Sequence, residues 1–211
     1  MARPSDNSVL SAIRTRRAVR AFKSDPIPRD VLMEILEAGN WAPSGGNFHP
    51  WRFVVVEDVE MRHRLRDSAY PHWEKEFSQG PFSEQFKNLV TDIYRRCVGW
   101  DFQSFEQLRP RVAEWKDGIY YDAPVFVFVL GDGVHAPMDC PMVCLNMMLA
   151  AHSLGVGSIW VSHGLLGLKD PQMKADLGIK DQEQVYGPVL IGYPKIVPQP
   201  PEKAQPVITW I

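Results

Sequence analysis

A cluster of three arginines near the start of the chain has the chemistry of an anion-binding site. Arg16, Arg17 and Arg20 lie within five consecutive positions. Guanidinium groups this close repel one another, so the cluster requires either solvent or an anion, such as a phosphate, that accepts several charge-assisted hydrogen bonds. Arg16 and Arg20 share one face if the helix expected from about residue 8 continues through them, whereas Arg17 points elsewhere. The alternative interpretation is a solvated basic surface.

A second segment, about one short helix further along, favours the ligand-binding interpretation. Residues 43–47 read Pro-Ser-Gly-Gly-Asn and cannot continue the helix before them. The two glycines allow the backbone to approach a flat ligand without side-chain obstruction. The edge of a flavin ring is such a ligand, so the two segments together indicate a site for flavin mononucleotide (FMN).

Both segments, in this order, resemble the N-terminal motifs of the nitroreductase superfamily of FMN-dependent NAD(P)H oxidoreductases. The resemblance extends to a central helix and the strand after it, and to the C-terminal motif, whereas residues from about 61 to 118 lack a confident counterpart. The matching segments are residues 16–22, 41–51, 146–161, 192–194 and 207–210.

The apolar patterns, in which strands alternate with helices, predict an α/β or α+β sandwich. The resemblance implies an α+β fold, with a mixed central sheet flanked by helices in an intertwined homodimer. We expect a single domain over residues 1–211, with a variable lid at about 61–118 and a C-terminal arm at about 195–211 that embraces the partner. The predicted helices span about 8–17, 28–39 and 138–154, and the predicted strands span 52–56, 124–130, 158–161 and 185–192.

The resemblance assigns the first motif to the cofactor, including Arg17. It puts Arg16 at the phosphate and Arg20 near the pyrimidine end of the flavin ring, where a cation stabilises the reduced, anionic flavin. Many relatives have serine at the position of Ala18, so this chain loses one hydrogen bond to the phosphate there but keeps the backbone.

Ser44, Gly45 and Asn47 correspond to the family segment that reaches the flavin from the second subunit. His49 occupies a position where relatives often have glutamine, and a structural turn residue is an equally good interpretation. Each active site would then be shared between two copies of the chain.

The resemblance puts Trp160, Val161 and Ser162 at the N5 edge of the flavin. The Ser162 hydroxyl would bond N5 in a deiodinase-like enzyme, although a plain strand-end serine is at least as good an interpretation. Lys203 fits a basic position that contacts the phosphate in relatives, and a solvated tail lysine is the alternative.

Substrate choice is expected to reside in the lid, where aromatic residues are dispersed among charged ones. Two or three of these aromatic side chains would face the flavin. They are Trp73, Phe77, Phe82, Phe86, Tyr94, Trp100, Phe102 and Trp115. A deiodinase-like lid would also need Glu, Tyr and Lys to hold an amino acid substrate, and the candidates are Glu74, Glu76, Tyr94, Lys87 and Lys116.

The resemblance implies an oxidoreductase that reduces nitroaromatic, quinone-like or other electron-poor small molecules with NAD(P)H by a ping-pong mechanism, with no covalent side chain. No GxGxxG or Walker-type loop is present, so a nicotinamide would bind against the flavin rather than in its own domain. The alternatives are a deiodinase-like flavin reductase of the same superfamily and a non-catalytic FMN-binding redox sensor.

Composition excludes several other classes. The 23 basic and 25 acidic residues nearly balance, so no nucleic-acid partner is expected. No hydrophobic run approaches the roughly 20 residues of a membrane span. The three cysteines show no CxxC spacing and follow no secretory signal, which indicates packing residues rather than a disulfide or metal site, and a cytoplasmic location.

Overall fold

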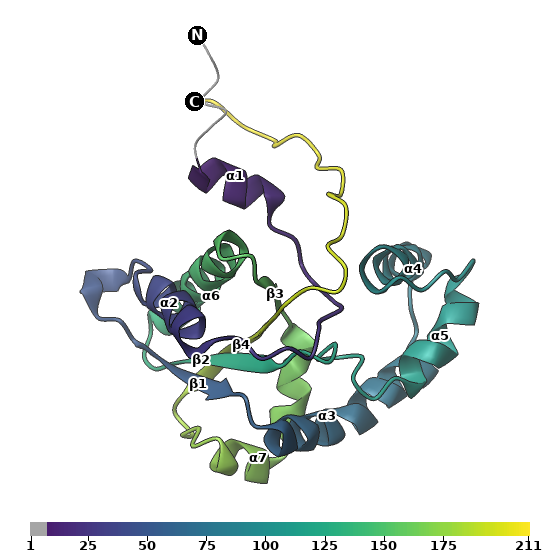
Figure 1. The fold of residues 1–211 in the computed structure, drawn as a ribbon, viewed down its shortest axis with the longest axis horizontal. Coiled ribbons are helices and arrows are strands. Elements are labelled where there is room, and N and C mark those ends of the chain that lie inside the picture. Colours follow the sequence, from purple (N-terminus) through teal and green to yellow (C-terminus); the bar gives the residue numbers. More distant parts are fainter. Residues whose placement is uncertain (1–7) are drawn as a thin grey trace.

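The computed structural model describes residues 8–211 and contains one four-stranded sheet between layers of helices (Figure 1). The strands are β1 (Trp51–Val56), β2 (Val125–Gly131), β3 (Gly157–Trp160) and β4 (Gln184–Gly192), in the order β1-β2-β4-β3. The α-helices are α1 (Ser8–Thr15), α2 (Arg29–Asn40), α3 (Val59–Gln79), α4 (Glu84–Val98), α5 (Phe105–Glu114), α6 (Ala136–Ser153) and α7 (Pro171–Asp176). Two 3₁₀ segments, η1 (Gly45–Asn47) and η2 (Ser162–Lys169), complete the set.

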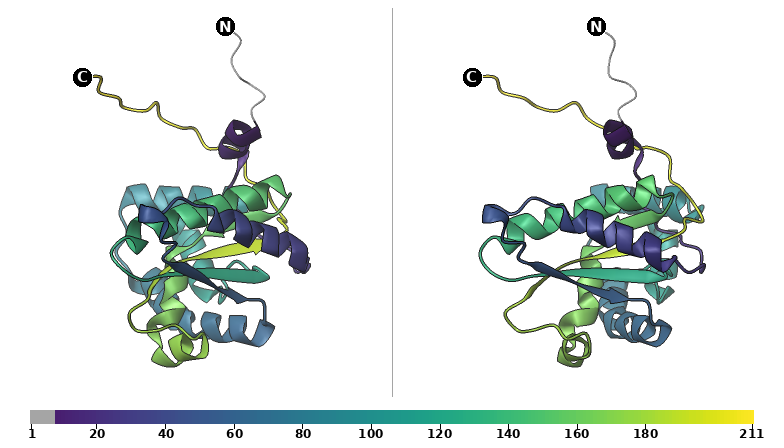
Figure 2. Two further views of the ribbon diagram at one scale, coloured as in Figure 1. Left: turned by 90° about the vertical axis from the view of Figure 1, so that its left-hand side faces the viewer. Right: turned by 60° about the vertical axis from the view of Figure 1, so that its left-hand side comes forward.

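The central strand β2 is buried along its whole length because helices cover both of its faces. Val125, Val127 and Val129 belong to a core formed with α2 and α6. The alternating residues Phe126 and Phe128 belong to a second core formed with α3, α5 and η2. Figure 2 shows α2 and α6 over one face of the sheet and α3 and α7 below the other. The predicted α+β class and the prediction of a buried central strand are therefore confirmed.

All neighbouring strands of the sheet pair antiparallel. Within residues 8–211, the one parallel pairing is an isolated bridge between Ala18 and Ser158, which adds the N-terminal segment to the free edge of β3. Among the described residues, this bridge alone gives the sheet the parallel pairing that a mixed sheet requires.

The expected lid region folds as α3, α4 and α5. Their N-termini are fixed by side-chain caps, in which Asp58, Ser83 and Ser104 accept hydrogen bonds from backbone N–H groups of the first turns. In Figure 1, α4 and α5 extend beyond one side of the sheet. The Arg109 Nη2 donates to the Gly80 carbonyl at 3.1 Å, which joins α5 to the segment after α3.

The two ends of the described chain leave the sandwich. Helix α1 has no buried residue, and the C-terminal segment after residue 194 forms no helix or strand (Figure 1). Trp210 and Val207 in that segment are almost fully exposed. Within residues 8–211 no helix is both long enough and apolar enough to cross a membrane.

Candidate functional site

The arginine motif is an extended segment rather than part of a helix. Helix α1 ends at Thr15, and the Val19 N–H donates to the Ser158 carbonyl at 3.1 Å. Val19 and Phe22 are buried, so burial and pairing with β3 outweigh the helix propensity of the preceding residues. The prediction that the first helix continues to about residue 17 is wrong, and Arg16 and Arg20 do not share a helix face.

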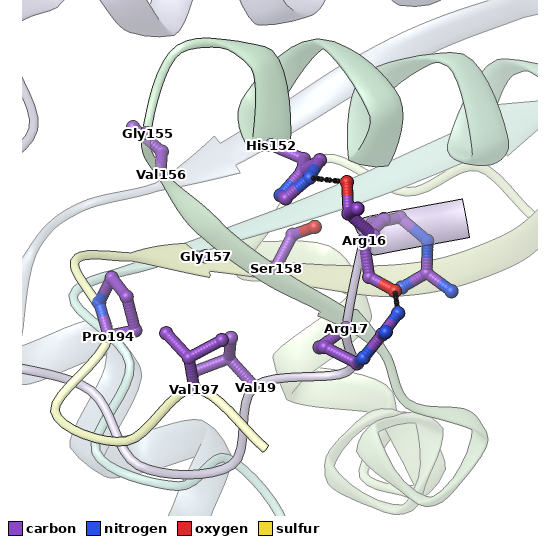
Figure 3. A pocket seen from close by; sticks show the side chains of 11 residues that line it. Arg16, Arg17, Val19, His152, Gly155, Val156, Gly157, Ser158, Pro194 and Val197 are labelled. Carbon is purple, nitrogen blue, oxygen red and sulfur yellow. Dashed lines mark hydrogen bonds between the residues drawn. The ribbon is translucent and has the colours of Figure 1, made fainter. Parts of the chain in front are cut away.

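Arg16 and Arg17 line a cavity of about 190 Å³, here called the basic pocket (Figure 3). The pocket is formed by the end of α1 and the motif after it, the end of α6 and the turn after it, the start of β3, and the segment that follows β4. The lining residues are Thr15, Arg16, Arg17, Val19, His152, Gly155, Val156, Gly157, Ser158, Pro194 and Val197.

The two arginines of the basic pocket have no carboxylate partner among the described residues. Arg17 Nη1 donates to two carbonyl oxygens, those of Arg14 and Arg16, both at 2.8 Å. Arg16 is half-buried, and burial followed by the charge of Arg17 lowers its pKa. Two uncompensated cations in a partly buried cavity favour an anionic ligand.

His152 adds a titratable group to the same pocket. Its Nε2 lies 2.7 Å from Thr15 Oγ1, and that hydroxyl also donates to the Ser11 carbonyl at 2.7 Å. Because a hydroxyl has one proton, His152 Nε2 must be the donor in the shared bond. Burial, and then the charges of Arg16 and Arg17, lower the pKa of His152.

Arg20 faces a different cavity, here called the lid pocket, of about 180 Å³ between the sheet edge and the lid helices. Four of the eight lid aromatics named above, Trp73, Phe77, Phe86 and Tyr94, contribute to its lining. The remaining lining residues are Arg20, Glu76, Val90, Ile93, Ile119, Tyr121, Val161 and His163. Such a cavity is suited to a planar apolar group next to one cation.

The polar groups of the lid pocket lie at two places. Arg20 is close to Tyr121, and the Arg20 guanidinium opposes the rise that burial produces in the pKa of Tyr121. On another wall, His163 Nε2 lies 3.5 Å from Glu76 Oε1, and the His163 ring meets Trp73 edge-on.

Ser44, Gly45 and Asn47 line neither the basic pocket nor the lid pocket. They form a local turn, in which the Gly45 N–H donates to Asp139 Oδ2 at 3.2 Å and the Ser44 hydroxyl accepts from the His49 N–H at 3.1 Å. His49 has a left-handed backbone conformation with φ of 48°, and its ring lies 3.0 Å from Asn47 Oδ1. Within one chain, His49 is thus a turn residue.

The residues predicted at the end of β3 are divided between the interior and the surface. Val161 lines the lid pocket, whereas Ser162 and Trp160 are exposed. Lys203 lies on the exposed C-terminal segment and contributes to neither pocket.

Sequence reasoning did not assign His152 and Ser158 to a site. Both reach the basic pocket only because β3 pairs with the arginine motif and α6 ends beside it. Their one sequence signal is the position around the Gly155 turn, where a helix gives way to a strand.

The candidate deiodinase residues are only partly assembled. Glu76 and Tyr94 line the lid pocket, but Lys87 pairs with Glu84 at 2.6 Å and Lys116 lies over the ring of Tyr70. Glu74 accepts a hydrogen bond from Ser78. No lysine within residues 8–211 lines the lid pocket, so Arg20 is the guanidinium that an amino acid carboxylate would meet there.

No cluster of metal-ligating side chains occurs within residues 8–211. Cys97, Cys140 and Cys144 are free and buried. Burial raises the pKa of Cys140 to about 11 and that of Cys144 to about 12, so both remain thiols at neutral pH.

Comparison with known proteins identifies the family to which this fold belongs. The profile described as "Nitroreductase family" matches residues 13–193. This chain belongs to the nitroreductase family, which confirms the predicted resemblance and enzyme class.

Individual relatives are consistent with this membership. A Thermus thermophilus protein named NADH dehydrogenase is 45% identical over 185 residues, covering 85% of this chain and 83% of the relative. A Bacteroides fragilis nitroreductase crystallised with bound FMN is 31% identical, with a TM-score of 0.68 and coverage of 97% of this chain and 99% of that one. Rat (Rattus norvegicus) iodotyrosine deiodinase 1 is 25% identical over 191 residues, which are 85% of this chain and 59% of the relative.

Proposed function

We propose that this chain binds FMN and uses it to reduce nitroaromatic, quinone-like or other electron-poor small molecules with NAD(P)H. The observation that carries the proposal is the pair of half-buried guanidiniums, Arg16 and Arg17, with no carboxylate partner among the described residues. They lie a few residues from Arg20, which lines an aromatic pocket. FMN has a phosphate at one end, which suits the basic pocket, and a planar ring at the other end, which suits the lid pocket.

Each residue would have a defined part in holding the cofactor. Arg16 and Arg17 would bind the phosphate through charge-assisted hydrogen bonds, and Arg20 would lie at the pyrimidine end of the ring. Val161 would pack near the N5 edge, with Trp160 and Ser162 next to it. Bound FMN would supply the electron transfer between NAD(P)H and the acceptor.

The lid pocket would admit donor and acceptor in turn. Trp73 and Phe77 would provide apolar surface for a planar substrate and exclude water from it. If donor and acceptor use the same pocket in turn, the kinetics are ping-pong. Double-reciprocal plots of initial rate against NAD(P)H concentration, at several fixed concentrations of acceptor, would then give parallel lines. Intersecting lines would contradict this order.

We also propose that the active unit is a homodimer. Trp41 and Phe48 near η1, Met138 on α6 and Trp210 in the C-terminal segment are large apolar side chains left exposed in one chain. Ser44, Gly45 and Asn47 line neither pocket of their own chain, as expected if they serve the partner's site. Analytical ultracentrifugation should give about twice the chain mass, and a monomer at micromolar concentration that still binds FMN would contradict a shared site.

The phosphate role is tested by Arg16→Ala. Charge-assisted hydrogen bonds contribute about 1.5–3 kcal/mol, so the Kd for FMN should rise at least about tenfold. Arg14→Ala is the matched control because Arg14 is exposed and does not line the basic pocket. Circular dichroism should show that both variants are folded. Unchanged FMN affinity in Arg16→Ala would remove this residue from the site.

The deiodinase-like alternative is favoured by Glu76 and Tyr94 in the lid pocket and disfavoured by the position of Lys87 and Lys116 outside it. Anaerobic incubation of the reduced protein with 3-iodotyrosine separates the two functions. Our proposal predicts negligible iodide release compared with the rate of nitroaromatic reduction, and the opposite order of rates would favour the alternative.

A further inference from the structure

The basic pocket contains a buried hydroxyl with no partner. Ser158 is 2% exposed, and its Oγ makes no hydrogen bond within the described chain. In Figure 3 the Ser158 side chain points toward the side of the pocket where Arg16 and His152 lie. An unsatisfied buried hydroxyl destabilises a fold, so this group needs either a partner or an explanation.

Packing does not explain the hydroxyl. Ser158 pairs with β4 and with the arginine motif through its backbone, and its carbonyl accepts the hydrogen bond from the Val19 N–H. Successive side chains of β3 alternate between the faces of the sheet, and the neighbouring Ile159 belongs to the core on the lid side. An alanine would preserve this backbone pairing without burying an unsatisfied polar atom.

The surroundings of Ser158 define the chemistry of its partner. The bridging residue opposite it, Ala18, has no polar side-chain atom, and the Thr15 hydroxyl already donates its proton to the Ser11 carbonyl. Ser158 is thus the only hydroxyl of the basic pocket whose proton is uncommitted among the described residues. Next to two guanidiniums, a free hydroxyl donor matches an anion with several acceptor oxygens.

We propose that Ser158 Oγ donates a hydrogen bond to the phosphate monoester that Arg16 binds, and so supplies from β3 the hydroxyl that position 18 lacks. This inference rests on the proposed function, because the phosphate is that of FMN. It identifies a phosphate-binding residue outside the arginine motif, brought there by the bridge between Ala18 and Ser158.

The test compares FMN with riboflavin, which has the same ring and ribityl chain but no phosphate. Binding to the purified apoprotein is measured by flavin fluorescence for wild type, Ser158→Ala and Ser158→Thr. Ser158→Ala should weaken FMN about tenfold and leave riboflavin affinity within about twofold, because only FMN has the acceptor. Ser158→Thr retains the hydroxyl in a residue type that strands favour, and should keep the wild-type preference for FMN.

Two controls separate the possible outcomes. Ser153→Ala removes an exposed hydroxyl of α6 that lies outside the basic pocket and should change neither affinity. Equal weakening of FMN and riboflavin in Ser158→Ala would indicate a structural role and overturn the inference, as would an unchanged FMN affinity. If wild type binds neither flavin, the proposed function itself fails; if wild type prefers FMN and Ser158→Ala keeps that preference, only this inference fails.

Discussion

At the scale of single residues, the basic pocket concentrates positive charge that the protein leaves uncompensated. Arg16 and Arg17 of the motif lie there beside His152 of α6, and no acidic residue among the described ones lines the cavity. Mutual repulsion between the two guanidiniums is unfavourable in the apoprotein, so an anion bound between them would stabilise the fold. The same repulsion has a consequence that can be measured without any ligand.

The pKa of His152 is sensitive to the positive charges of Arg16 and Arg17. Burial, Arg16 and Arg17 hold it below the ordinary value of 6.5, so the neutral ring predominates at pH 7. In Arg16→Ala one repelling charge is lost and the ring becomes more accessible, and both changes should raise this pKa. An NMR titration of the His152 ring in the apoprotein measures the shift, with Arg14→Ala as control. A pKa equal to that of wild type would mean that Arg16 does not approach the imidazole.

At the scale of elements, the connection between α5 and β2 has a strained backbone and contains a buried carboxyl group. Tyr121 and Asp122 are consecutive residues with φ of 55° and 56°, a conformation that side chains disfavour. Asp117, at the start of this turn, accepts backbone hydrogen bonds from Tyr120 and Tyr121 through its carbonyl. The turn positions Tyr121 against Arg20 in the lid pocket.

Burial, followed by the neighbouring Asp122 carboxyl, raises the pKa of Asp117 to about 7, although the charge of Arg66 acts in the opposite direction. Since the unfolded chain titrates near 3.8, the folded state binds the extra proton between about pH 4 and pH 7, and stability falls as pH rises through that range. The Asp117→Asn variant has no ionisable carboxyl group at this position, so this part of the pH dependence of stability should be absent from it.

Between pH 4 and pH 7 the free energy of unfolding of wild type should therefore fall relative to that of Asp117→Asn. Above pH 7 the difference between the two proteins should stay constant. A difference of about 1 kcal/mol corresponds to roughly 2–4 °C in Tm for a chain of this length. Calorimetry at pH 4.5, 6 and 8 measures it. A constant difference across these three pH values would show that Asp117 is not neutral in the folded protein near pH 6.

The regular elements were predictable because their patterns are local. The run from residue 124 to 130 predicted β2 within one residue, and the apolar stretch from 138 to 154 predicted most of α6. The end of α1 was missed because pairing of Ala18 with β3 depends on a residue 140 positions away, Ser158. For the same reason, sequence patterns indicated Arg16 and Arg20 but not His152 or Ser158.

At the scale of the whole molecule, the residues expected to hold the cofactor lie in separate places on one chain. The basic pocket lies beside α6 and the C-terminal segment, the lid pocket lies under α3 and α4, and the turn at η1 joins neither. A net charge of −2 gives no long-range attraction for anions, so local geometry must supply the affinity. In our proposal, a second copy completes the site with its Ser44, Gly45 and Asn47.

The most direct test of this account is the visible absorption spectrum of the purified protein reconstituted with FMN, followed by anaerobic addition of NADH or NADPH and then of a nitroaromatic or quinone acceptor. We predict a bound-flavin spectrum that bleaches with at least one nicotinamide and returns when the acceptor is added. Bound flavin that does not bleach would contradict the NAD(P)H oxidoreductase function and favour a sensor. Failure to bind FMN would refute the central claim.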